Sequence, residues 1–148
     1  MNLDRYFARI GFTGPPNADL ATLRALHRLH IEAIPFENLD VLLGRRIDMS
    51  EAAVESKIVD DGRGGYCFEQ NTLFRGVLNA LGFQTEAFLG RIRRNVPADV
   101  RTPLTHMVLR VTVEGAPWLA DVGFGSLGTP APIRRAADAP RTPPHRKP

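Results

Sequence analysis

Residues 63–92 of the chain read RGGYCFEQNTLFRGVLNALGFQTEAFLGRI, and the spacing of the apolar residues changes within this stretch. Up to residue 81 they recur every three or four positions, which predicts a helix that begins at Tyr66 or Cys67 and ends at Leu81. Gly82 suits the position that follows a helix. Residues 83–92 have the pattern of a strand instead. A helical half therefore meets a β half at residue 82.

Three further helices are predicted before this stretch. The first covers residues 3–10, where the apolar side chains fall on one face, and a segment with glycine and proline ends it. The second begins at Asp19, which can cap it, and ends before Pro35. An Asp-x-x-Glu pattern at residues 48–51 resembles a capping box for a helix that extends to about residue 59. The first half of the chain is thus predicted to be helical.

The residues after this stretch predict two more strands. Apolar and polar residues alternate over residues 107–113, and residues 118–122 return after a turn at 114–117. Beyond Gly125 no periodicity remains. Because the helices come first and the strands second, the order indicates an α+β fold with an antiparallel sheet rather than a parallel βαβ sheet.

The composition bounds the class of protein. A chain of 148 residues, 43% of them hydrophobic, suits one domain or two small ones. It has no apolar run of about 18 residues and no secretory signal at its start, so we expect neither a membrane segment nor export. A single cysteine cannot form an internal disulfide, so we expect a cytoplasmic protein.

The net charge of +3 is unevenly distributed along the chain. Residues 129–148 carry five basic residues against one acidic residue, together with six of the twelve prolines, so the first 128 residues sum to −1. A nearly neutral body thus ends in a basic, proline-rich tail. The whole-chain charge therefore gives little support to a nucleic-acid partner.

Cys67 is the centre of the chemical prediction. A lone cysteine is more often a small buried hydrophobic residue than a nucleophile. Here the cysteine follows Gly64, Gly65 and Tyr66 and opens a predicted helix, whose N-terminus stabilises a thiolate. The two glycines leave room for a substrate. This context favours a nucleophile, with a buried and inert thiol as the alternative.

A thiolate nucleophile needs a histidine to activate it, and that histidine needs an orienting acceptor. His27 and His30 lie on the leucine-rich second helix, where structural histidines are common, and His145 lies in the tail. His106 opens a strand after a loop, and Asp121 ends an apolar strand, where a carboxylate needs a partner. The hairpin register places a residue two to four positions after the histidine opposite the aspartate. Contact therefore requires a bulge, a bend or a diagonal reach, and bonding of Asp121 to backbone amides is the alternative.

With these residues identified, the sequence resembles the arylamine N-acetyltransferase family. The four segments that carry the resemblance are Pro35-Phe36-Glu37-Asn38-Leu39, Arg63-Gly64-Gly65-Tyr66-Cys67-Phe68-Glu69-Gln70-Asn71, Thr105-His106-Met107 and Asp121-Val122-Gly123-Phe124-Gly125. The opening segment, residues 6–11, is similar too. The resemblance covers residues 1–133, and the combination of all four segments is very specific.

The resemblance implies an acetyltransferase with a Cys-His-Asp triad. Cys67 would take the acetyl group from acetyl-CoA as a thioester and pass it to an arylamine or hydrazine nitrogen, with ping-pong kinetics. His106 would pair with the thiolate, and Asp121 would orient the imidazole. Acetyl-CoA would be a co-substrate, with no metal and no bound prosthetic group. Neither nucleic acid nor a membrane would be a partner, and the oligomeric state stays open.

The resemblance also implies roles for residues around the triad. Phe36 and Phe124 would form aromatic walls of the acceptor pocket. Glu37 and Arg63 would form a supporting ion pair behind the site. The residues implied beside the pyrophosphate and thioester arm of CoA are Thr102, Pro103 and Thr105.

The fold implied by the family sets expected domain bounds. Residues 1–84 would form a helical bundle, and residues 85–133 an incomplete antiparallel β-barrel, in a core like that of cysteine proteinases and transglutaminases. The C-terminal lid domain would be missing, and residues 134–148 would form an irregular Pro/Arg-rich tail. We therefore expect a truncated chain with low or absent turnover, and a frameshift near codon 134 is the hypothesis for its origin.

Two other functions stay open. A transglutaminase-like or papain-like hydrolase would share the order Cys, His, Asp but would not explain residues 35–38 and 63–65 together. An inactive remnant of the family would keep Cys67 buried and unreactive. A nucleic-acid binder that relies on the basic tail receives little support.

Overall fold

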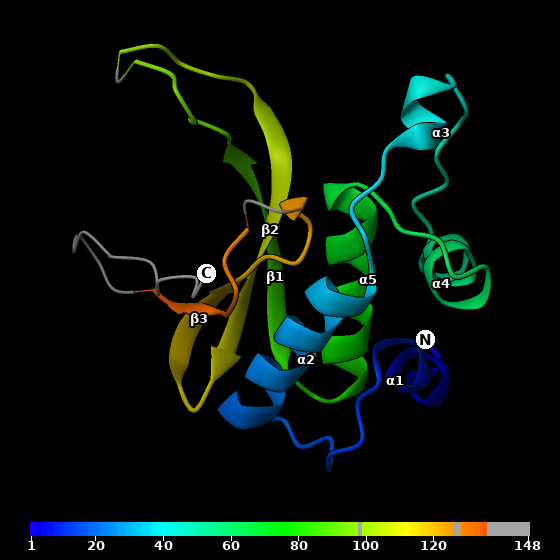
Figure 1. Ribbon diagram of the computed structural model, residues 1–148. Coiled ribbons are helices and arrows are strands. Elements are labelled where there is room, and N and C mark those ends of the chain that lie inside the picture. The colour runs from blue at the N-terminus through cyan, green and yellow to red at the C-terminus, as the bar shows by residue number, and fades with distance from the viewer. Residues whose placement is uncertain (98, 126–127, 136–148) are drawn as a thin grey trace, which may run out of the picture.

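The computed structural model describes residues 1–97, 99–125 and 128–135. Figure 1 shows helices α1 to α5 followed along the chain by the strands of one sheet. The elements are α1 (Leu3–Ile10), α2 (Leu20–Ala33), α3 (Leu39–Leu42), α4 (Glu51–Glu55), the π-helix η1 (Ser56–Asp60), α5 (Cys67–Ala80), β1 (Gln84–Arg91), β2 (Leu104–Val113), β3 (Ala116–Ala120) and β4 (Ile133–Arg134). This order confirms the α+β prediction.

Local capping explains where the helices begin. The α2 prediction is confirmed, because the Asp19 side chain accepts a hydrogen bond from the Thr22 N–H at 2.7 Å. The capping box expected at residues 48–51 is wrong. Ser50 caps α4 instead by accepting from the Ala53 N–H, while Asp48 accepts from the N–H of Ser50 itself. A hydroxyl one residue before the helix is placed better for its free N–H groups than a carboxylate further upstream.

The strands form one antiparallel sheet in the order β1-β2-β3-β4. The returning strand lies two residues earlier than predicted, because the turn at Glu114 and Gly115 is tight and both residues have positive φ. The short helix α3 and the strand β4 were not predicted, since neither is long enough to show a period. Among the described residues the sheet stays open and does not close into a barrel.

Helix α5 holds the two halves together. It lies between the sheet on one side and α1 and α4 on the other (Figure 1). Fully buried Leu73, Phe74, Val77 and Leu78 from α5 belong to the same hydrophobic core as the inward-facing residues of β2. Burial of side chains of this size stabilises the folded state by about 2 kcal/mol each. The site described below is built on α5 and on the strands that pack against it.

The domain bounds at residues 84 and 133 stay predictions, and most of the expected tail, residues 136–148, lies outside the described residues. Of the helices that the structure describes, none has both the length and the apolarity to cross a bilayer.

Candidate active site

Cys67 is the first residue of α5, and its backbone position is fixed by a cap. The Glu69 carboxylate accepts a hydrogen bond from the Tyr66 N–H at 3.1 Å, so the helix begins at the cysteine. The thiol is 8% exposed and lies 3.8 Å from the carbonyl oxygen of Thr105, to which it can donate. The thiol therefore lies at the positive end of the helix.

His106 and Asp121 are brought together across the β2–β3 hairpin. Leu109 pairs with Ala120, so continuation of the register places Val108 opposite Asp121. His106 lies two residues before Val108 in β2, so its contact with Asp121 is a diagonal one. The His106 Nε2–H donates to Asp121 Oδ2 at 2.6 Å, which leaves Nδ1 as the ring nitrogen available to the thiol.

The surroundings of His106 favour its charged form. Burial disfavours the imidazolium, but the hydrogen bonds with Asp121 and Cys67, followed by the charges of the same two groups, raise the pKa of His106 to about 9. The ring is therefore protonated at neutral pH. Cysteine, imidazolium and aspartate can thus form a thiolate–imidazolium pair that a carboxylate stabilises.

Asp121 is held by two side chains that sequence reasoning did not place at the site, one at its carboxylate and one at its backbone. Asn71 Nδ2 donates to Asp121 Oδ1 at 3.1 Å and to the Met107 carbonyl at 2.9 Å, and Asn71 Oδ1 accepts from the Val122 N–H at 3.2 Å. His27 Nε2 accepts from the backbone N–H of Asp121 at 3.3 Å. The sequence contained one clue to Asn71 that was not used: it follows Cys67 by four residues and so lies on the same face of the predicted helix.

Both histidines of α2 are buried and neutral. Burial, the largest cause, lowers the pKa of His27 to about 4 and that of His30 to about 3. His30 lies between the Tyr6 hydroxyl at 2.9 Å and Gln70 Oε1 at 3.0 Å. Both are structural, as their place on a leucine-rich helix predicted, and His27 in addition contacts the backbone of Asp121.

A cavity of about 340 Å³ opens beside the thiol. The residues that line it are Phe36, Cys67, Ile92, Thr105, His106, Gly123 and Phe124. The Phe124 ring stands edge-on to the imidazole, with 4.9 Å between the ring centroids. Phe36 and Phe124, expected at the acceptor pocket, therefore both reach the space beside the cysteine.

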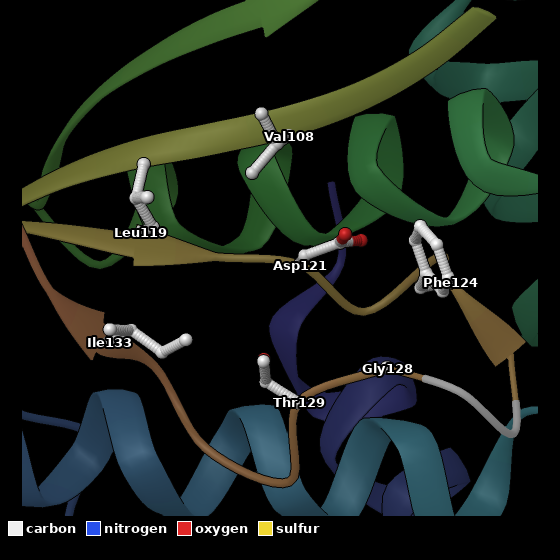
Figure 2. Close-up of a pocket in the computed structure, with 7 residues that line it drawn as sticks. All are labelled: Val108, Leu119, Asp121, Phe124, Gly128, Thr129 and Ile133. Atoms are coloured by element: carbon white, nitrogen blue, oxygen red, sulfur yellow. The ribbon is translucent and has the colours of Figure 1, made fainter. Parts of the chain in front are cut away.

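A second pocket lies on the other side of the aspartate. Its volume is about 320 Å³, and its lining residues are Val108, Leu119, Asp121, Phe124, Gly128, Thr129 and Ile133. Figure 2 shows the Asp121 carboxylate directed toward Phe124, which lines both pockets. Phe124 is thus shared by the two spaces, whereas Asp121 lines the second one.

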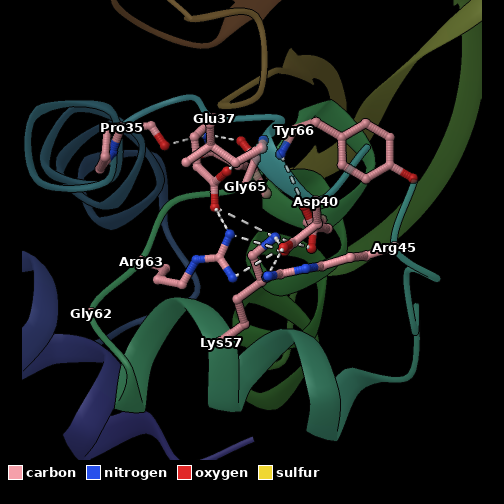
Figure 3. Close-up of polar contacts among 12 residues, drawn as sticks. Pro35, Glu37, Asp40, Arg45, Lys57, Gly62, Arg63, Gly65 and Tyr66 are labelled. Atoms are coloured by element: carbon pink, nitrogen blue, oxygen red, sulfur yellow. Dashed lines mark hydrogen bonds and ion pairs between the residues drawn. The ribbon is translucent and has the colours of Figure 1, made fainter. Parts of the chain in front are cut away.

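The expected ion pair is part of a larger group of charges. Arg63 Nη2 lies 2.7 Å from Glu37 Oε1 and 2.9 Å from Asp40 Oδ2, and Lys57 contacts both carboxylates (Figure 3). Sequence reasoning missed Asp40 and Lys57, because nothing in the local pattern shows that residues so far apart in the chain meet.

The residues expected beside CoA lie before and within the start of β2. The Thr102 carbonyl accepts from the Arg91 guanidinium, and the Thr102 hydroxyl is buried without a partner among the described residues. Pro103 is exposed, and Thr105 lines the cavity beside the thiol. Within the described part of the chain, no group of three or more His, Cys, Asp or Glu side chains is arranged so that it could hold a metal ion.

Comparison with known proteins places this site in a family. A family model described as N-acetyltransferase matches residues 19–147. The arylamine N-acetyltransferase of Escherichia coli (strain K12) is 48% identical over 143 residues, which are 97% of this chain and 50% of that protein.

Solved structures of the same family resemble this chain in fold as well as in sequence. The arylamine N-acetyltransferase of Salmonella typhimurium superposes with a TM-score of 0.88 at 45% identity, over 97% of this chain and 52% of that chain. The Mycobacterium marinum enzyme in complex with CoA gives a TM-score of 0.87 at 41% identity, over 93% and 52% of the two chains. The chain thus spans about half the length of these relatives, and it belongs to the arylamine N-acetyltransferase family.

Proposed function

We propose that the chain carries the acetyl-transfer centre of an arylamine N-acetyltransferase, with Cys67 as nucleophile, His106 as acid and base, and Asp121 as orienting carboxylate. The observation that carries the proposal is the 2.6 Å contact of His106 with Asp121 beside the cavity that Cys67 lines. The family and its CoA-bound member support acetyl-CoA as the donor.

The first half-reaction follows from the charges of the pair. The Cys67 thiolate attacks the acetyl carbonyl carbon of acetyl-CoA, and the bond from that carbon to the CoA sulfur breaks. His106 gives its proton to the departing CoA sulfur and becomes neutral. Cys67 is left as an acetyl thioester.

The second half-reaction returns the site to its starting state. The nitrogen of an arylamine or hydrazine attacks the thioester carbon, His106 takes the proton from that nitrogen, and the Cys67 sulfur leaves as a thiolate. Asp121 stabilises the imidazolium at the start and end of the cycle. We place the acceptor ring between Phe36 and Phe124, which line the cavity.

Other residues complete the proposed site. We place the CoA arm beside the loop that leads into β2. The residues assigned there are Thr102, Pro103 and Thr105. Glu37 and Arg63 support the site from behind the cysteine.

We propose that these 148 residues by themselves turn over slowly. Phe88 and Leu89 of β1, and Leu104 at the start of β2, are 41–53% exposed. Uncovered apolar strands of this kind favour association over catalysis. The second pocket beside Asp121 also admits water next to the triad.

Intact mass spectrometry after incubation with acetyl-CoA tests the proposal. We expect slow gain of one acetyl group, its absence in Cys67→Ala, and its release when an arylamine is added. Fast, complete acetylation would contradict slow turnover. Absence of any acetylation, with hydrolysis of a peptide substrate in its place, would favour a thiol hydrolase.

A further inference from the structure

A group of charges behind the cysteine connects two segments of the site. The ionic cluster consists of Glu37, Asp40, Lys57, Arg63 and Glu69. Figure 3 labels the first four of these residues. Arg45 also contacts Asp40, at 3.2 Å, but its side chain is 63% exposed. The cluster joins the segment that carries Phe36 to the first turn of α5.

Lys57 is the member that contacts all three carboxylates. Its Nζ lies 2.8 Å from Glu69 Oε1, 2.9 Å from Asp40 Oδ2 and 3.5 Å from Glu37 Oε1. The side chain is 14% exposed, so water screens these contacts weakly. Lys57 belongs to the π-helix η1, a rare element that is frequent at functional sites.

Glu69 depends on Lys57. The Glu69 residue is 2% exposed, and Lys57 supplies its one ion pair within the part of the chain that the structure describes. One oxygen of Glu69 accepts from Lys57, and the other accepts from the Tyr66 N–H that precedes the cysteine. The cap that sets the start of α5 is therefore held by the ammonium group.

The same cluster fixes the wall of the cavity. The Glu37 N–H donates to the Gly65 carbonyl at 3.1 Å, and Phe36 forms a parallel bridge with Gly65. The Glu37 carboxylate also accepts from the Leu39 N–H at 2.9 Å. Lys57 thus touches both the residue after Phe36 and the residue that caps the helix of Cys67.

We propose that Lys57 is a positioning residue for acetyl transfer: it balances the charge of Glu69, and so keeps the first turn of α5 favourable to the Cys67 thiolate. The inference rests on the proposed function and deepens it. Without the ammonium, a buried carboxylate two residues after the cysteine would oppose the thiolate. A lysine that only stabilised the fold would leave the reactivity of the thiol unchanged once the chain is folded.

Iodoacetamide alkylation measures this effect directly, because Cys67 is the only cysteine of the chain. The assay needs no acetyl-CoA, so it separates this inference from the proposed function. We expect Lys57→Met to lower the alkylation rate at pH 6 by about tenfold, because the Glu69 carboxylate would then lie near the sulfur without a cation to balance its charge. The groups that face the cluster are unchanged in this variant. They are Glu37, Asp40, Arg45, Arg63, Glu69 and Tyr66.

Two comparisons separate an effect of charge balance at Glu69 from a general disturbance of the fold. Arg45→Met removes a cation that contacts the same cluster but not Glu69, and we expect its rate within twofold of the parent. Lys57→Met/Glu69→Gln removes both charges while the amide oxygen can still cap the helix, and we expect its rate within twofold of Glu69→Gln. Circular dichroism establishes that each variant is folded.

The outcomes are distinct. An unchanged rate in Lys57→Met overturns the inference, and so does an equal loss in Arg45→Met. If Lys57→Met does not fold, the alkylation rates of Glu69→Gln and of the double variant still test the inference. A difference above fivefold between these two rates would show that Lys57 acts other than through Glu69, and would overturn it. Fast alkylation without acetylation by acetyl-CoA would contradict the proposed function and leave this inference intact.

Discussion

Replacement of Asn71 by alanine tests the second layer of the site. The Asn71 side chain is fully buried and makes three hydrogen bonds, to Met107, Asp121 and Val122. Each such bond contributes about 1 kcal/mol, and a buried group left without a partner costs about 1–3 kcal/mol. Since the Val122 N–H and the Met107 carbonyl both lose a partner, we expect the free energy of unfolding to fall by about 3–5 kcal/mol.

Urea unfolding followed by circular dichroism measures this loss, and it is a large share of the total stability of about 5–15 kcal/mol expected for a domain. Asn79→Ala is the matched control, because Asn79 lies on the same helix but is exposed, and among the described residues its side chain bonds only Thr85. Asn71→Asp preserves the shape but places a carboxylate against Asp121, and we expect it to be at least as destabilising. If Asn71→Ala and Asn79→Ala differ by less than about 1 kcal/mol, the reasoning about buried hydrogen bonds here is wrong.

Three further predictions follow from the geometry. The pKa values of His27 and His30 are lowered by burial, so below about pH 6.5 the unfolded chain binds more protons than the folded chain. The free energy of unfolding should therefore be roughly 2–4 kcal/mol smaller at pH 5 than at pH 7. Equal urea midpoints at the two pH values would contradict this. A Cβ at Gly64 would collide with the backbone carbonyl of Pro35, whereas a Cβ at Gly90 would lie 3.8 Å from its nearest neighbour, so Gly64→Ala should lower the melting temperature and Gly90→Ala should not. Asp121→Asn removes a charge that raises the pKa of His106, so the histidine should titrate at lower pH in NMR spectra, and an unchanged titration would exclude the carboxylate as a cause.

Strong local patterns made parts of the fold predictable. The helical period and the glycines around it gave the bounds of α5 to within one residue. The hairpin register placed one of residues 108–110 opposite Asp121, and the structure places Val108 there by continuation of the β2–β3 pairing. These features depend on neighbours in the chain, which is why the sequence alone reveals them.

Features that depend on distant contacts were not predictable. Lys57 meets Glu37 and Asp40 across 20 and 17 residues, and Asn71 meets Asp121 across 50. The sequence around Lys57 has the pattern of an ordinary helix, which gives no sign that the ammonium group will be buried among three carboxylates. The π-helix that carries it likewise leaves no periodic signal, since it is a single turn.

The central claim is that Cys67 is a nucleophile activated by His106. Its most direct test is the rate at which an activated acetyl ester, p-nitrophenyl acetate, acetylates the thiol at pH 7, followed by intact mass. The account predicts a single acetyl group on the parent chain, none on Cys67→Ala, and a rate about 100-fold lower in His106→Gln. Equal rates in the parent and His106→Gln, or acetylation that persists in Cys67→Ala, would contradict the claim.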